Sequence, residues 1–374
     1  MRILYGVQGT GNGHLTRARV MAPALAEAGI EVQYLFSSRP REGFFDMQPF
    51  GDWWWRRGLT FVSRNGRVSR LGTLGRSPDL LTFAADVKAL DLSGFDLVLC
   101  DFEPVSAWAA LFQGKPVVGL GHQQAFGYPI PKCRGGWLAR AMLRYYAPVS
   151  VGLGLHWHHF GQPILPPLVE PMMAEDVQEN LILVYLPFES PGAIRRLLAP
   201  FGKWEFHVYH GSVEEEHRER NVSWHRISRQ GFQRLLARAS GVICNSGFEL
   251  ISEALQANKK ILTRPLAGQW EQCCNAKALQ QLGWGRVMAR LDRESVARWL
   301  GESPPVKVDY PDVASAIVAW LKQGEWYVDP EWTQSLWRRT RFHDNPETKD
   351  NPAILAAPPS EVFFSQRQEK GPMA

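Results

Sequence analysis

Apolar residues near the N-terminus change their spacing twice, which predicts a strand, a helix and a second strand. Residues 3–7 form a short apolar run, typical of a strand buried on both faces. Residues 15–26 then repeat apolar positions at helical spacing, Gly29 ends this helix, and residues 32–36 begin the next strand. The turn between the first strand and the helix is rich in glycine, with Gly9, Gly11 and Gly13. Such a turn exposes backbone N–H groups at the positive end of a helix dipole, where phosphate or a closely approaching substrate can bind.

A titratable side chain, His14, lies where this turn becomes helix, the position that a general base needs. The order of strand, turn, helix and strand recurs over residues 97–120, and polar side chains follow its strands: Asp101, Glu103, His122 and Gln123. Because parallel strands end at one edge of a sheet, we expect these side chains to share one crevice with the glycine turn. Asp101 or Glu103 has a second interpretation, as the cap of the helix that begins after Pro104.

Four prolines between residues 163 and 171 separate this half from a second half with the same pattern. In the second half, Ser246 and Gly247 begin a helix, where backbone N–H groups can meet phosphate. Polar side chains follow the next strand: Gln269, Glu271, Gln272 and Asn275. We therefore predict an α/β fold with two Rossmann-like domains. The predicted divisions are residues 1–165, residues 166–325, a terminal helix within 326–344 and a disordered tail at 345–374.

The net charge of +5 and the isoelectric point near 9.0 favour anionic small molecules or an anionic membrane surface over nucleic acid. The N-terminus has no long apolar signal region, and no stretch approaches 18 apolar residues. We expect a cytoplasmic protein, either soluble or peripheral on the inner face of the membrane. Residues 53–78 carry six arginines and no acid among aromatic residues. They fit an electropositive surface that meets an anionic acceptor or lipid headgroups, or else a solvated face whose tryptophans pack inward.

Two residue groups raise the question of metal or disulfide chemistry. The five cysteines are odd in number and contain no CxxC, which argues against a disulfide framework or a zinc site. Cys100 and Cys244 end apolar runs and are expected in the core. His156, His158 and His159 form a cluster without HExxH spacing or a nearby acid, so we expect no metal there.

The chain resembles the GT-B glycosyltransferases over about residues 1–325. "GTGNGHLTRA" is similar to the glycine-histidine loop of the N-acetylglucosaminyltransferase that forms lipid II, and "HQQAF" to its histidine motif after a strand. "CNSGFELISEAL" followed by "GQWEQCCNAKALQQLG" resembles the donor signature of these enzymes. More narrowly, "GVQGTGNGHLTRA", "CDFEPVSAWAA" and "HW...ILPP" resemble a family of bacterial and archaeal glycosyltransferases labelled teichoic-acid-biosynthesis-like.

This resemblance implies two parallel sheets that face each other across a cleft, with roles for particular residues. Glu253 matches the glutamate that hydrogen-bonds the donor ribose, and His14 matches a loop histidine proposed to assist catalysis. The other implied donor-site residues are Ser228 and Arg229 near the nucleobase, Ser246 and Gly247 at the diphosphate, and Gln269, Glu271, Gln272 and Asn275 at the sugar. The first turn of the second half, "PFESPGA", departs from the pattern because it lacks the glycine-serine pair.

The implied function is transfer of a sugar from a UDP-linked donor to a hydroxyl of a glycan or lipid-linked acceptor, with His14 or else Asp101 as the base. We expect inversion, no metal and no cofactor other than the nucleotide-sugar substrate, since no DxD sequence occurs. A nicotinamide-dependent oxidoreductase is disfavoured, because the second strand ends "FSSR" without the acid that binds the ribose. A sugar-nucleotide 2-epimerase and a non-catalytic nucleotide-sugar-binding protein remain as alternatives.

Overall fold

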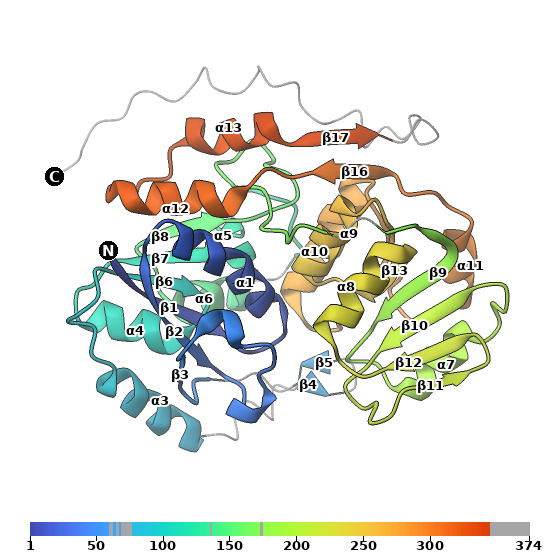
Figure 1. The fold of residues 1–374 in the computed structure, drawn as a ribbon, viewed down its shortest axis with the longest axis horizontal. Helices are drawn as coiled ribbons and strands as arrows, with labels where there is room; N and C mark the ends of the chain where they lie inside the picture. Colours follow the sequence, from blue (N-terminus) through green and yellow to red (C-terminus); the bar gives the residue numbers. More distant parts are fainter. Residues whose placement is uncertain (60–62, 65–66, 69–76, 135–136, 173–174, 345–374) are drawn as a thin grey trace.

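The computed structural model describes residues 1–59, 63–64, 67–68, 77–134, 137–172 and 175–344 (Figure 1). They form an α/β fold with two Rossmann-like domains, each built on a largely parallel sheet, which confirms the predicted fold class. The predicted disordered tail, residues 345–374, lies outside the described residues.

The first sheet surrounds the glycine turn. In spatial order its strands are β3 (Trp54–Trp55), β2 (Glu31–Ser37), β1 (Arg2–Gln8), β6 (Leu97–Asp101), β7 (Val117–Gly121) and β8 (Val151–Gly154). Its helices are α1 (Gly13–Glu27), α3 (Ser77–Ala89), α4 (Pro104–Phe112), α5 (His122–Ala125) and α6 (Trp137–Tyr145), with 3-10 turns η1 (Arg41–Gly43) and η2 (Gln48–Phe50) and a hairpin of β4 (Ser63–Arg64) and β5 (Arg67–Val68). The chain winds outward in both directions from the neighbours β1 and β6. Their carboxyl ends, where Val7 pairs with Asp101, therefore form the switch point at which such sheets bind ligands.

The second sheet repeats this plan. In spatial order its strands are β11 (His217–Glu219), β12 (Val222–His225), β10 (Glu205–Tyr209), β9 (Gln178–Tyr185), β13 (Ala239–Asn245), β14 (Lys260–Arg264) and β15 (Arg286–Val287). Its helices are α7 (Pro191–Leu198), α8 (Arg229–Arg238), α9 (Phe248–Gln256), α10 (Trp270–Leu282) and α11 (Arg293–Leu300). Here β9 and β13 are the diverging neighbours, so the switch point lies at the start of α9.

The last part of the chain returns to the first domain. After β16 (Val306–Asp309) come α12 (Val313–Gln323), α13 (Pro330–Arg339) and β17 (Arg341–Asp344), which pairs antiparallel with β16. Figure 1 shows α12 and α13 above the first sheet, and α12 packs against α1. The Trp337 indole on α13 donates to the Ile164 carbonyl, 2.6 Å away in the proline-rich connection. Thus α12, although it lies within the range predicted for the second domain, covers the first.

Aromatic side chains fill the junction between the domains. Trp157, from the connection, is fully buried and stacks on Phe248 of α9, with ring centroids 5.3 Å apart. Its indole N–H donates to the Ser252 hydroxyl at 2.9 Å. The His122 ring also stacks on Phe248, with ring centroids 4.1 Å apart. The first residues of the connection are therefore packed as core between the domains.

A disulfide between Cys133 and Cys273 also joins the domains, from the loop after α5 to α10. The expectation of no disulfide is wrong for this pair. An odd cysteine count and the lack of CxxC carry no information about two cysteines separated by 140 positions. Cys100 and Cys244 are buried free thiols, as predicted.

The basic aromatic segment is described only in part, because most of residues 60–76 lie outside the described residues. In the described part, Trp53 packs on Phe36 and Phe44, with centroids 5.5 Å and 5.4 Å away, as the inward-packing interpretation expects. The Arg41 guanidinium lies over the Trp53 ring, 5.0 Å from its centroid. No helix among the described residues has the length and apolar character needed to cross a membrane.

Candidate active site

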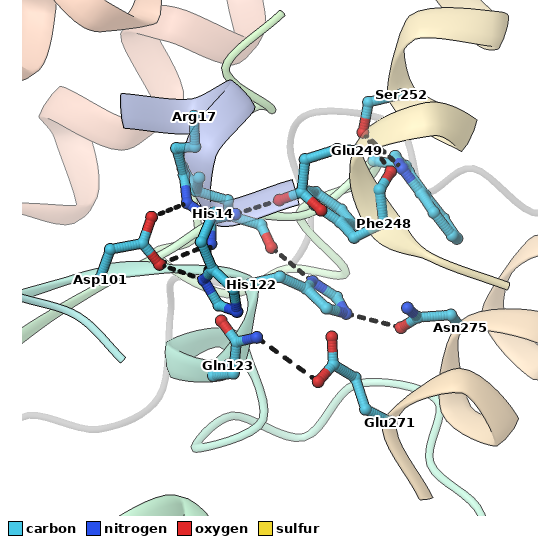
Figure 2. Close-up of polar contacts among 12 residues, drawn as sticks. His14, Arg17, Asp101, His122, Gln123, Phe248, Glu249, Ser252, Glu271 and Asn275 are labelled. Carbon is cyan, nitrogen blue, oxygen red and sulfur yellow. Dashed lines mark hydrogen bonds and ion pairs between the residues drawn. The ribbon is translucent and has the colours of Figure 1, made fainter. Parts of the chain in front are cut away.

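The switch point of the first sheet brings His14 and Asp101 together. His14 is the second residue of α1, Asp101 ends β6, and His14 Nδ1 lies 2.6 Å from Asp101 Oδ1 (Figure 2). Nδ1 also lies 3.1 Å from Arg17 Nη2, but its shorter contact is with a carboxylate, which only accepts hydrogen bonds. We therefore assign the ring proton to Nδ1 and the lone pair to Nε2. The His14 side chain is 13% exposed, whereas Asp101 is fully buried. The pair thus has the form of a base with its orienting carboxylate.

An arginine fixes the buried carboxylate. Arg17 Nε and Nη2 donate to the two Asp101 oxygens, each at 2.7 Å. Burial alone would raise the pKa of Asp101, but the Arg17 guanidinium and then His14 outweigh it and hold that pKa below its usual value. Arg17 Nη1 also forms an ion pair with Glu249, in the first turn of α9. Sequence reasoning did not select Arg17 or Glu249. The spacing of three between His14 and Arg17, which places both on one helix face, was the available signal.

The other residues selected at the first sheet have different positions. His122 Nδ1 faces the Leu155 carbonyl at 2.9 Å and its Nε2 faces Asn275 Oδ1 at 2.6 Å. Gln123 donates to Glu271 of the second domain at 3.4 Å. Glu103 is fully buried and caps α4 by accepting from two backbone N–H groups. Its carboxylate also accepts from a serine hydroxyl at 2.6 Å, so the helix-cap interpretation is the one observed.

Close approach to the backbone requires one of the three glycines, Gly9, and a side chain lies close to a second, Gly13. A Cβ at Gly9 would collide with the Ser37 carbonyl, and one at Gly13 would collide with the Glu249 carboxylate. Gly11 has a φ of 87°, in the left-handed region that favours glycine, and a Cβ there would meet open space. The turn therefore lets the second domain come within contact of the start of α1.

The start of α9 is open to a ligand. Gly247 is its N-cap, which provides no side-chain hydrogen bond, and a Cβ there would meet nothing within 4 Å. Ser246 lies just before it, fully buried, with its hydroxyl 2.8 Å from that of Thr263. Asn275 donates to the Ser246 carbonyl at 2.9 Å, while its Oδ1 faces His122. Unpaired N–H groups at a helix start suit a diphosphate.

Glu253 lies on α9, six residues after the N-cap Gly247, and is 5% exposed. It accepts a hydrogen bond from Gln233 at 3.2 Å. Burial, and secondly the Glu170 carboxylate, raises the pKa of Glu253 to about 8, against the effect of that hydrogen bond. Arg229, the first residue of α8, pairs with Glu170 at 2.6 Å, and Ser228 caps that helix.

The side-chain oxygens of the two glutamines predicted to contact the sugar accept hydrogen bonds from backbone N–H groups. Gln269 Oε1 caps α10 by accepting from the Gln272 N–H at 2.5 Å. Gln272 Oε1 in turn accepts from the Leu266 N–H at 2.8 Å. Together these bonds shape the turn that presents Glu271 and Asn275 to the first domain (Figure 2).

The histidine cluster lies in an apolar environment. Burial lowers the pKa of His158 to about 3 and lowers that of His156 well below its usual value. Within the described residues, no group of three or more His, Cys, Asp or Glu side chains has an arrangement suited to a metal ion. His156, His158 and His159 act there as aromatic packing groups, in contact with Phe160 and Trp337.

A family model described as "Glycosyl transferase family 1" matches residues 1–304. No curated protein sequence matches the chain. Solved structures with a similar fold include the glycotransferase of kitacinnamycin (15% identity, TM-score 0.53, 86% of this chain and 94% of that one). A second is the glycosyltransferase SnogD from Streptomyces nogalater, with 19% identity, a TM-score of 0.51 and coverage of 86% of this chain and 99% of that one. A third is the glycosyltransferase VinC in complex with dTDP, with 16% identity, a TM-score of 0.53 and coverage of 90% of this chain and 99% of that one.

Proposed function

The chain belongs to glycosyl transferase family 1, and from this membership we propose that it moves a sugar from a nucleotide-sugar donor to an acceptor hydroxyl. One observation carries the proposal. The pair of His14 and Asp101, at the switch point of one sheet, lies opposite the open start of α9, at the switch point of the other.

We assign His14 as the base and Asp101 as its orienting carboxylate. His14 Nε2 takes the proton of the acceptor hydroxyl while that oxygen bonds to the anomeric carbon, and the bond to the donor diphosphate breaks. The Asp101 carboxylate stabilises the imidazolium that results. Asp101 is less suited to be the base, because it is fully buried and Arg17 and His14 occupy both of its oxygens.

On the donor side, the leaving diphosphate meets the N–H groups that begin α9, where the positive end of the helix dipole offsets its charge. Glu253 binds the ribose hydroxyls from within the same helix. We propose a pyrimidine diphosphate donor, with UDP first and dTDP second, since VinC is described with dTDP. The proposed transfer uses one displacement, which inverts the anomeric centre, and requires no metal. Activity that survives dialysis against EDTA and a product of opposite anomeric configuration are the expected results. A retained anomer would contradict the single displacement.

The acceptor is proposed to be a glycan or a lipid-linked hydroxyl near an anionic membrane surface. Exposed apolar side chains occur on α3 and α4, which pack together, and α3 begins at Ser77, where the basic segment 53–78 ends in the sequence. Leu81 is 78% exposed and Phe112 is 73% exposed. Sedimentation with vesicles that contain anionic lipid, and not with neutral vesicles, is the expected result. Equal absence from both pellets would favour a soluble acceptor.

A thermal-shift panel of nucleotide sugars tests the donor assignment, because a ligand of the native state at 100 times its Kd adds about 2.7 kcal/mol of stability. We expect a UDP or dTDP sugar to raise Tm and NAD(H) to leave it unchanged. Stabilisation by NAD(H) alone would overturn the proposed function. Incubation of the stabilising donor without acceptor then separates the alternatives, since an epimerase would convert it to its 2-epimer and a transferase would not.

A further inference from the structure

One buried arginine connects the proposed base to the opposite domain. Arg17 lies on α1 one turn after His14 and is 2% exposed. Two of its nitrogens donate to Asp101 of the first domain, and the third pairs with Glu249 of the second (Figure 2). A single guanidinium therefore binds carboxylates from both domains at once. Its planar fork of N–H groups makes this geometry specific to arginine, since a lysine ammonium is a point charge.

The contact between Glu249 and α1 is built into the chain on both sides. Gly13 leaves the space that the Glu249 carboxylate occupies, because a Cβ at Gly13 would collide with it. Glu249 lies two residues after Gly247, the N-cap at which the donor diphosphate is proposed to bind. Burial would lower the pKa of Arg17, but the Asp101 and Glu249 carboxylates raise it, so the guanidinium stays charged inside this junction.

We propose that Arg17 is a positioning residue that couples the alignment of His14 to closure of the two domains. The proposal rests on the proposed function. When the domains close, Glu249 binds Nη1 of Arg17. This contact holds the guanidinium in the orientation in which Nε and Nη2 donate to both Asp101 oxygens. When the domains open, Nη1 forms hydrogen bonds with water instead, and the hydrogen bonds from Arg17 to Asp101 weaken. Asp101 then no longer fixes the orientation of the His14 imidazole. The acceptor is then deprotonated only when α9, which carries the donor, is in place.

Two variants and a matched control test this coupling. Glu249→Gln removes the charge that meets Nη1 and leaves His14 and Asp101 intact, while Arg17→Lys keeps the charge and removes the fork. Arg19→Lys is the control, since Arg19 is a buried arginine of the same helix that donates to the Phe45 and Asp46 carbonyls and to neither carboxylate. All proteins are kept reduced, so that the Cys133–Cys273 disulfide does not hold the domains together.

We expect both test variants to lower kcat by about tenfold or more while KM for donor and acceptor stays within about twofold. The control should retain the kcat of the wild type. A purely structural contact would instead raise both KM values and lower Tm with little selective loss of kcat. Unchanged kcat in Glu249→Gln would overturn the coupling.

Hydrogen–deuterium exchange supplies a readout without activity. In the reduced, ligand-free protein, Glu249→Gln and Arg17→Lys should raise exchange in residues 13–17 and 248–251 together, and Arg19→Lys should not. If no nucleotide sugar binds the wild type, the proposed function is wrong. The hydrogen–deuterium exchange measurement still tests whether Arg17 bridges the domains. Unchanged exchange in both segments would overturn the bridge itself.

Discussion

Replacement of Glu253 by glutamine should make the stability of the fold less dependent on pH. Burial, followed by the Glu170 carboxylate, raises the pKa of Glu253 from 4.5 to about 8 in the folded state. The folded protein therefore binds this proton more tightly than the unfolded chain. The resulting stabilisation is fully present below about pH 4.5 and is lost as the pH rises through about 8.

The size of this effect follows from the two pKa values. The interval from 4.5 to about 8, at about 1.36 kcal/mol per pKa unit, corresponds to about 5 kcal/mol as an order of magnitude. The glutamine amide stays neutral at every pH. The free energy of unfolding of Glu253→Gln, relative to wild type, should therefore improve by up to about 5 kcal/mol between pH 4.5 and 9.

Urea unfolding at several pH values measures this difference. Glu294→Gln, at an exposed glutamate of α11, is the control and should follow the wild-type curve. Parallel curves for wild type and Glu253→Gln would refute a proton bound by the folded state at Glu253.

The proton that Glu253 binds in the folded protein also provides a test of donor binding. Ribose hydroxyls donate to an ionised carboxylate, so donor binding at pH 7 should release about 0.9 proton from a group whose pKa is about 8. Calorimetry in two buffers of different ionisation enthalpy counts this proton, and Glu253→Gln should release none. Donor binding without proton release in the wild type would remove Glu253 from the ribose site.

Three further predictions concern the base and the junction. His14→Ala should lose about 10²–10⁴-fold in transfer rate while donor binding persists in the thermal-shift assay, and equal loss of both would make His14 a binding or structural residue. Cys273→Ser should lower the free energy of unfolding by up to about 5 kcal/mol in the chain-entropy relation for a loop of 140 residues, and identical stability of oxidised and reduced wild type would show that the bridge does not form. Trp157→Phe loses the bond to Ser252 and ring area on Phe248, so urea unfolding should show a cost of about 1–3 kcal/mol, and a cost near zero would contradict the packing described.

Sequence periodicity placed His14 and Asp101 correctly, because both follow parallel strands whose ends must meet. It left two interpretations of Glu103, since a carboxylate after a strand can either cap the next helix or face the cleft, and the geometry of α4 decides this. Arg17 and Glu249 were missed for a different reason. Their pairing depends on how two domains face each other, which no local pattern encodes.

The same limit applies to the contacts of α12 and the cysteines. The apolar face of α12 would have the same sequence pattern whichever domain it covered. The sequence-based prediction therefore placed α12 in the domain that precedes it in the chain, whereas it packs on α1 of the first domain. Cys133 and Cys273 lie 140 positions apart and become neighbours only through the domain arrangement.

The return of α12 to the first domain has a mechanical consequence. The described chain crosses between the domains in the connection that contains Ile164, between β16 and α12, and again between α13 and β17. The bond from Trp337 to Ile164 ties the first of these crossings to the end of α13. We expect two bodies attached along such a seam to move mainly by rotation about it, with one principal angle between the domains. The Cys133–Cys273 bond adds a covalent attachment away from these crossings, and we expect its reduction to free the angle between the domains.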